Sequence, residues 1–111
     1  MKYALLIYED EAAYGSKDKG LMTAAHMAFG REAGTAITGG AGLKGSAVAT
    51  TIRAANGART VHDGPFAETK EQLGGFYLVD APDLDAAIEI AKKVPLVEGR
   101  GAVEIRPLLG G

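Results

Sequence analysis

An α+β fold is predicted by the order of short apolar segments and amphipathic segments along the chain. Residues 3–8 are almost wholly aliphatic and aromatic and are typical of a central strand. Two segments with helical periodicity follow, separated by strand-like segments, and a last strand-like segment closes the chain. The resulting order, β-α-β-β-(β)-α-β, predicts a ferredoxin-like split β-α-β antiparallel sheet with both helices on one face.

The first helix is predicted over residues 20–37. Its apolar side chains share one face of a helical wheel: Met22, Ala25, Phe29, Ala33, Ala36 and Ile37. Gly30 and Gly34 oppose the helix, each by about 1 kcal/mol relative to alanine. Residues 9–19 precede it and are predicted to form an acidic, polar loop.

A β-hairpin is predicted by two segments on either side of a turn. Residues 48–53 alternate in the manner of a strand, Asn56-Gly57 favours a tight turn, and residues 59–63 return. Gly64-Pro65 ends the second strand because proline cannot donate to a sheet ladder. Residues 66–74 are then expected to form a loop.

The C-terminal part predicts a strand, a helix and a strand. Residues 76–80 form the first strand, and Asp83 is a favourable helix N-cap. Pro95 ends the helix, and residues 102–106 form the last strand. The buried stripe of this helix consists of Leu84, Ala87, Ile88 and Ala91.

The composition predicts a single globular domain over residues 1–111. Hydrophobic residues make up 47% and the formal net charge is −2, so neither disorder nor nucleic-acid binding is favoured. The chain has no cysteine, which excludes disulfides and a thiolate nucleophile. Its apolar segments are too short for a signal peptide or a membrane span, so we expect a cytoplasmic location without membrane association.

The most specific motif is Asp63-Gly64-Pro65-Phe66, followed by Glu68-Thr69-Lys70-Glu71-Gln72-Leu73-Gly74-Gly75. This segment closely resembles the signature of the DGPF group within the YciI-like (YCII-related) family. The resemblance extends over nearly the whole chain and is weakest over residues 11–45. It implies the dimeric α/β-barrel type of fold, in which two sheets come together. Most members of that family have no assigned reaction.

A homodimer is expected for a physical reason as well. Two helices cover one face of the predicted sheet and leave the other face exposed to water, where a second sheet commonly packs. Arg53, Glu104 and Arg106 are expected to lie on this face as dimer contacts.

The candidate catalytic residues are His26 and Asp63. His26 falls within the apolar stripe of the first helix, where burial can tune an imidazole for acid–base chemistry. The alternative is a histidine at the core edge bonded to a backbone carbonyl. Asp63 shares a strand face with Val61, on the side where His26 could meet it. The alternative for Asp63 is a turn role before Gly64-Pro65.

Other polar residues are assigned to the pocket mouth or the surface. Phe66, Glu68, Thr69 and Lys70 are candidate substrate-binding residues, although Lys70 and Glu71 could instead make bonds within the loop. His62 is expected on the open sheet face. Glu9, Asp10 and Glu11 could suggest a metal site, but consecutive side chains fan outward, so a solvated loop is favoured. The Gly39-Gly40-Ala41-Gly42 run lacks the context of a nucleotide-binding loop.

Two functions from different classes follow. The first is a cofactor-independent enzyme that uses a His–Asp pair for elimination or hydration of a small organic molecule. The resemblance supports it, because some YciI-like proteins carry such a pair in a cleft and one characterised relative is a dehydrochlorinase of hydroxylated aromatics. The second is a non-catalytic module for small-molecule sensing or protein interaction. Here the resemblance implies an association with extracytoplasmic-function sigma factors.

Overall fold

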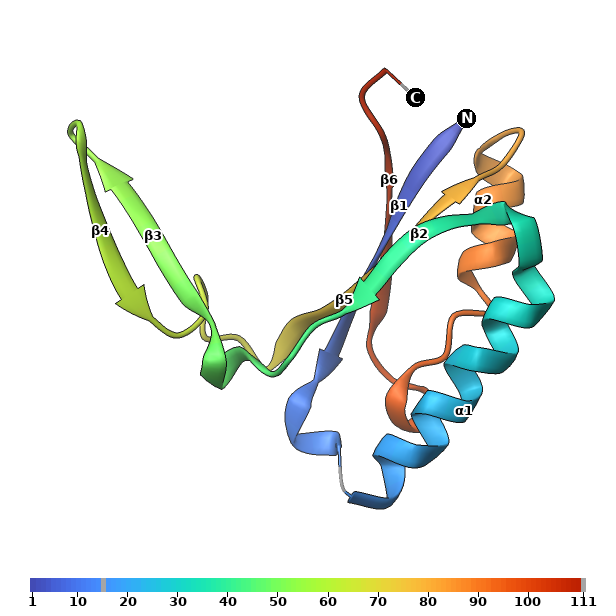
Figure 1. Cartoon of the computed structure of the whole chain (residues 1–111), viewed down its shortest axis with the longest axis horizontal. Helices are drawn as coiled ribbons and strands as arrows, with labels where there is room; N and C mark the ends of the chain where they lie inside the picture. Colours follow the sequence, from blue (N-terminus) through green and yellow to red (C-terminus); the bar gives the residue numbers. More distant parts are fainter. Residues whose placement is uncertain (15, 111) are drawn as a thin grey trace.

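The computed structural model describes residues 1–14 and 16–110, with the side chains of residues 16–19 left aside. Its main element is a four-stranded antiparallel sheet in the order β2-β5-β1-β6. Figure 1 shows both helices on the same side of this sheet. The bounds are β1 Lys2–Asp10, α1 Ser16–Ala33, β2 Ile37–Gly42, β5 Glu71–Asp80, α2 Leu84–Ala91 and β6 Ala102–Pro107.

This arrangement is the predicted ferredoxin-like α+β fold. The connection through α1 places β2 beyond β5, so β5 lies between the two strands that α1 joins. The connection through α2 likewise places β6 on the far side of β1. Every pair of neighbouring strands is antiparallel, as the split β-α-β topology requires.

The core lies between the helices and one face of the sheet. Alternate residues of β1, namely Tyr3, Leu5 and Ile7, are buried beneath the helices because side chains alternate along a strand. They pack in one cluster with Phe29 of α1 and, from the rest of the chain, with Val79, Ala81, Ala87, Ala91 and Val94. The predicted N-cap of α2 is confirmed, since Asp83 Oδ1 accepts a hydrogen bond from the Ala86 N–H at 2.9 Å.

The predicted hairpin forms, but it does not join the main sheet. Strands β3 (Thr50–Ala55) and β4 (Ala58–Asp63) make a separate two-stranded sheet that extends away from the rest of the chain (Figure 1). Asn56 and Gly57 form the turn, both with positive φ. We call this hairpin the arm. It raises the radius of gyration to 15.6 Å, compared with about 13 Å for a compact chain of this length.

Strand β2 was not predicted, and the first helix was placed too far along the chain. Helix α1 begins at Ser16 and ends at Ala33, and the residues from Ile37 onward form β2 rather than a helical turn. The short side chains of β2 hide its strand character. Gly40 is required there: its φ is +148°, and an added Cβ would lie 2.5 Å from the Phe76 carbonyl oxygen.

Two predicted loops also contain strand. Glu9 and Asp10 continue β1, and β5 begins at Glu71 rather than at residue 76. The ladder between β1 and β5 explains both extensions, because Glu9 pairs with Gln72 and Asp10 with Glu71 beyond a register shift. No helix in the described ranges is long and apolar enough to cross a bilayer.

Candidate functional site

A pocket of about 960 Å³ lies where α1 crosses the ends of β1, β2 and β5. Much of its wall is backbone, because β2 and β5 contribute glycines rather than large side chains there. These are Gly40, Gly42, Gly74 and Gly75. Among the polar side chains that line the pocket are Glu9, Glu11, Tyr14, His26 and Tyr77.

His26 and Tyr77 form a direct contact in this pocket. Nδ1 of the imidazole lies 2.7 Å from the Tyr77 hydroxyl oxygen, which is hydrogen-bonding distance. Helix α1 carries His26 on the face that also buries Phe29, and the Tyr77 ring packs against Phe29 with centroids 5.0 Å apart. The ring packing therefore orients the tyrosine toward the histidine.

The surroundings favour neutral side chains in this pair. Burial lowers the pKa of His26 below its ordinary value, while the negative charge of Glu9 opposes this shift. Burial also raises the pKa of Tyr77, so its hydroxyl keeps its proton at neutral pH. In a neutral imidazole one ring nitrogen carries the proton and the other has a free lone pair. The hydrogen bond to Tyr77 selects between these two tautomers.

Glu9 is a buried carboxyl group in the pocket wall, with only 5% of its surface exposed. The Tyr14 hydroxyl donates to its Oε1 at 2.7 Å, and the Val97 N–H donates to its Oε2 at 2.5 Å. These bonds offset the cost of burying the group. Burial, followed by the hydrogen bond to Glu9 and its charge, raises the pKa of Tyr14. The prediction of a solvated loop at Glu9 was therefore wrong.

Glu11 connects the pocket rim to the base of the arm. Its carboxylate accepts two hydrogen bonds from Ser46, one from the backbone N–H and one from the hydroxyl, both at 2.7 Å. Ser46 lies in the segment between β2 and β3. This segment leads directly into the arm, so the two hydrogen bonds connect the pocket rim to the base of the arm.

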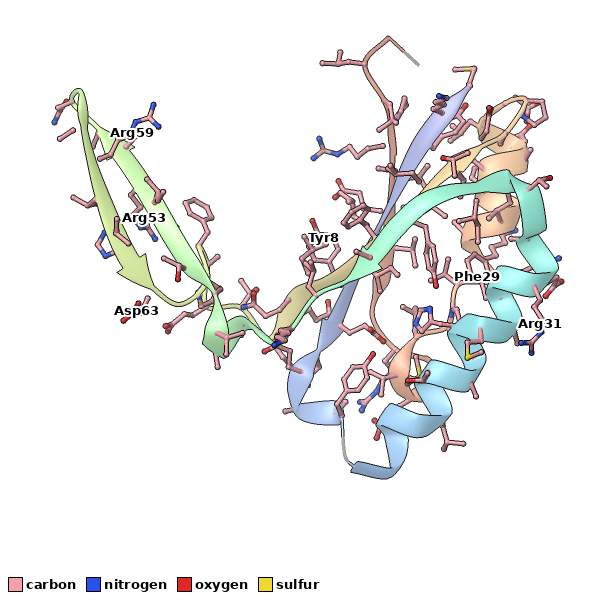
Figure 2. All side chains as sticks on the ribbon, viewed as in Figure 1. Tyr8, Phe29, Arg31, Arg53, Arg59 and Asp63 are labelled. Carbon is pink, nitrogen blue, oxygen red and sulfur yellow. The ribbon has the colours of Figure 1, made fainter. Side chains whose placement is uncertain are left out.

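Asp63 does not lie in this pocket. It is the last residue of β4, exposed, and paired in register with Thr50 across the arm. Figure 2 shows Asp63 on the arm, on the opposite side of the main sheet from α1, where Phe29 and Arg31 are labelled. Within one chain the structure thus brings His26 to Tyr77 and does not bring it to Asp63.

The predicted substrate-binding residues lie beside a second, shallower depression at the base of the arm. Glu68, Thr69 and Lys70 line it, with a volume of about 520 Å³. Phe66 does not line it; its ring is 71% exposed and lies 5.0 Å from the Arg53 guanidinium. Arg53 also donates to the Phe66 carbonyl at 3.0 Å, so it belongs to the arm and not to the face of the main sheet.

Internal hydrogen bonds hold the segment after Phe66. Gln72 Nε2 donates to the carbonyls of Ala67 and Thr69 at 2.8 and 3.0 Å. The Thr69 hydroxyl donates to the Glu71 carbonyl at 2.6 Å. Gly64 adopts a φ of +102°, a conformation that favours glycine, and its N–H donates to the Ala49 carbonyl at 2.7 Å. These bonds set the path of the chain out of the arm.

Polar pairs form on the arm and on β6. The prediction that His62 lies on the open face of the main sheet was wrong, because β4 belongs to the separate sheet of the arm. His62 Nε2 lies 2.9 Å from the Thr60 hydroxyl on the arm, and both residues are exposed. Arg106 donates to Glu104 at 3.0 Å on β6. Within residues 1–14 and 16–110, no group of three or more acidic or histidine side chains is placed to hold a metal ion.

Sequence reasoning missed Glu9, Tyr14 and Tyr77. A signal existed for two of them. Glu9 continues the alternation of Tyr3, Leu5 and Ile7, and Tyr77 alternates with Val79 on the face toward the helices. The position of Tyr14 depends on a tertiary hydrogen bond, which no local pattern reveals.

The fold and the pocket define a small ferredoxin-like α+β protein with a pocket beneath its first helix. A model of the YCII-related domain matches residues 1–110, so the chain belongs to the YCII-related family. The chain is also 39% identical over 115 residues to an uncharacterized protein of Rhizobium meliloti (strain 1021). That alignment covers 97% of this chain and 92% of the relative.

Proposed function

We propose that this protein is an acid–base enzyme of the lyase type that acts on a small organic molecule bound beside His26. The observation that carries the proposal is the 2.7 Å contact between His26 Nδ1 and the Tyr77 hydroxyl inside a pocket of about 960 Å³. A half-buried imidazole with a lowered pKa is a neutral base at physiological pH, which is the state that proton abstraction requires.

The proposed step is an elimination. When His26 donates its Nδ1–H to the Tyr77 oxygen, the second ring nitrogen has a free lone pair and can take a proton from a substrate carbon. The electron pair of that C–H bond forms a C=C bond, and the leaving group on the adjacent carbon departs with its own bonding pair. Chloride leaves as the anion, whereas a hydroxyl group leaves as water when the His26 imidazolium returns the proton to it.

Glu9 contributes to this step through its charge. The negative charge that raises the pKa of His26 also stabilises the imidazolium that forms when His26 takes the proton. The Tyr77 hydroxyl orients the ring. The tyrosine therefore occupies the position beside His26 where the sequence interpretation expected Asp63. A catalytic role for Asp63 remains a separate proposal, and it would require the carboxylate to arrive from a second copy of the chain.

The enzyme proposal is tested by incubating the protein with small hydroxylated and chlorinated compounds that carry a C–H bond on the adjacent saturated carbon, and by measuring released chloride or lost water. His26→Gln is expected to reduce the rate by about 10²–10⁴-fold, as for other general bases. His62→Gln is the matched control, because the chain has only two histidines and His62 lies on the arm. Equal rates in both variants would exclude His26 as the base.

A second candidate function is that of a module that senses a small ligand or binds another protein. We propose that this module is cytoplasmic and is functionally associated with a sigma factor. The hydrogen bonds from Ser46 to Glu11 favour it, because they connect the pocket rim to the arm. A ligand that binds and shifts the amide resonances of the arm, yet is recovered unchanged, would support sensing over catalysis. Either function is proposed for a homodimer that covers the helix-free face of the main sheet.

A further inference from the structure

One face of the arm has an apolar pair at its centre, between Arg59 and Asp63 on the same strand, and nothing covers this pair within the described chain. Ile52 and Val61 lie directly opposite each other across β3 and β4, so their side chains share a face. They are 63% and 69% exposed. Val48 and Phe66 flank the base of the arm and are 69% and 71% exposed, with the Phe66 ring beside Arg53 on the other face. Large apolar side chains gathered in this way are typical of an interaction surface.

The main sheet presents a second apolar surface on its helix-free face. Leu6 and Tyr8 of β1 alternate with the buried residues of that strand and therefore point away from the helices. Two residues of β5 belong to the same surface: Phe76 pairs with Leu6, and Leu78 pairs with Ala4. All four large side chains are only half-buried. Figure 1 shows the arm on this side of the sheet, opposite the helices.

The total surface area indicates how much remains to be covered. The chain exposes 7518 Å², whereas a compact monomer of 11.4 kDa exposes about 5,800 Å². The excess, about 1,700 Å² per chain, is roughly twice the 800 Å² that each partner buries in a protein interface of standard size. An excess of this size is what a protomer of a permanent dimer shows when its partner is removed.

The arm also needs a partner for its own stability, because an isolated two-stranded hairpin is only marginally stable in water. We propose that the arm of each protomer lies across the helix-free sheet face of a second copy of this chain. Each protomer carries both surfaces, the arm and the sheet face. A two-fold axis therefore places the arm of each protomer on the sheet face of the other, and both arms are covered. This inference rests on the proposed homodimer and specifies how it is held together.

The arm contact has a consequence for the pocket. Ser46, at the base of the arm, holds Glu11 at the pocket rim through two hydrogen bonds of 2.7 Å. When the arm is docked on the partner, this segment is anchored at both ends. Docking of the arm on the partner therefore also restrains the pocket rim at Glu11.

The first test is the mass of an arm variant. Ile52→Asp combined with Val61→Asp places two charges on the apolar arm face, and both sites are exposed, so the protomer itself keeps its packing. Leu21→Asp on α1 is the matched control, since Leu21 is also 69% exposed. Sedimentation should give a dimer for the wild type and the control, and a monomer for the arm variant. A dimeric arm variant would overturn the inference.

The second test locates the arm. The chain has no cysteine, so Val61→Cys accepts a single nitroxide label. Labelled copies are mixed with ¹⁵N-enriched copies that lack the label. We expect broadened amide signals for Leu6 and Tyr8 in the ¹⁵N copies. Broadening confined to samples with label and ¹⁵N on the same chain would show that the arm folds onto its own sheet, which overturns the inference.

These outcomes separate the arm from the chemistry. A monomeric wild type would refute the homodimer together with the arm contact, and the activity of His26 would still be decided by its own substitution. A protein that forms the arm-linked dimer but has no activity would refute the proposed enzyme function and would leave the proposed interface supported.

Discussion

The hydroxyl of Tyr77 lies 2.7 Å from Nδ1 of His26, and the two residues come from strand β5 and helix α1. The contact joins the only histidine in the pocket lining to a side chain that burial keeps protonated. The pair thereby links the layer of helices to the sheet and fixes the orientation of the imidazole in the pocket.

Removing the charge of Glu9 should lower the pKa of His26 further. Burial lowers this pKa, and the charge of Glu9 is the effect that opposes burial. Glu9→Gln keeps the size of the side chain and removes the charge. The imidazole titration followed by NMR should move to lower pH, with His62 as the internal reference. The acid limb of any pH–rate profile should move the same way, because the base works only when neutral. A higher pKa in this variant would contradict the assignment.

Tyr77→Phe should change the imidazole without disturbing the core. The phenylalanine ring keeps the packing against Phe29 and removes the hydroxyl that contacts Nδ1. We expect a loss of stability of about 1 kcal/mol, typical of one hydrogen bond, measured by urea unfolding. The ¹⁵N shifts of the His26 ring should show a different balance of tautomers. Unchanged ¹⁵N shifts would mean that the contact does not select the tautomer.

Asp63→Asn tests whether the predicted His–Asp pair exists between chains. The first measurement uses the Ile52→Asp/Val61→Asp variant, which is expected to be a monomer. In this variant Asp63→Asn should leave the pKa of His26 unchanged, because Asp63 lies on the arm, away from the pocket of its own chain. The same substitution in the dimer gives the informative comparison. A lower pKa of His26 there would show that Asp63 reaches the pocket of the partner, and an unchanged pKa would remove Asp63 from the site.

Gly64→Ala and Gly30→Ala should change stability in opposite directions. Gly64 has a φ of +102°, which an alanine adopts only with strain, so a loss of about 1–3 kcal/mol is expected. Gly30 lies inside α1 with open space around it, and alanine there should add up to about 1 kcal/mol. Thermal melts of both variants against the wild type provide the measurement. A Gly64→Ala protein as stable as the wild type would show that the turn tolerates a side chain.

Local sequence patterns predicted the elements whose side chains carry a clear signal. The apolar run at the start of β1, the Asn56-Gly57 turn and the Asp83 cap all identify their elements correctly. The glycine-rich strand β2 gave no such signal, because its place is set by backbone pairing with β5. Local patterns also cannot tell whether a hairpin joins a sheet or leaves it.

The candidate site was predicted only in part for the same reason. His26 was found because its position on the helix wheel is a local property, and it does face the sheet. Its contact with Tyr77 depends on how α1 crosses β5, which is a tertiary property. Asp63 was assigned to the helix-facing side on the assumption that β4 belongs to the main sheet. That assumption was wrong, because β4 is part of the arm, which forms a separate sheet.

The glycines of the pocket wall determine which molecules can fit there. At Gly40 and Gly75 an added Cβ would meet backbone oxygen at 2.5 and 2.9 Å, so a side chain at either position requires the strands to move. At Gly42 the same atom would meet nothing within 4 Å. Size selectivity can therefore be adjusted at Gly42, one methyl group at a time, while the neighbouring wall keeps its shape.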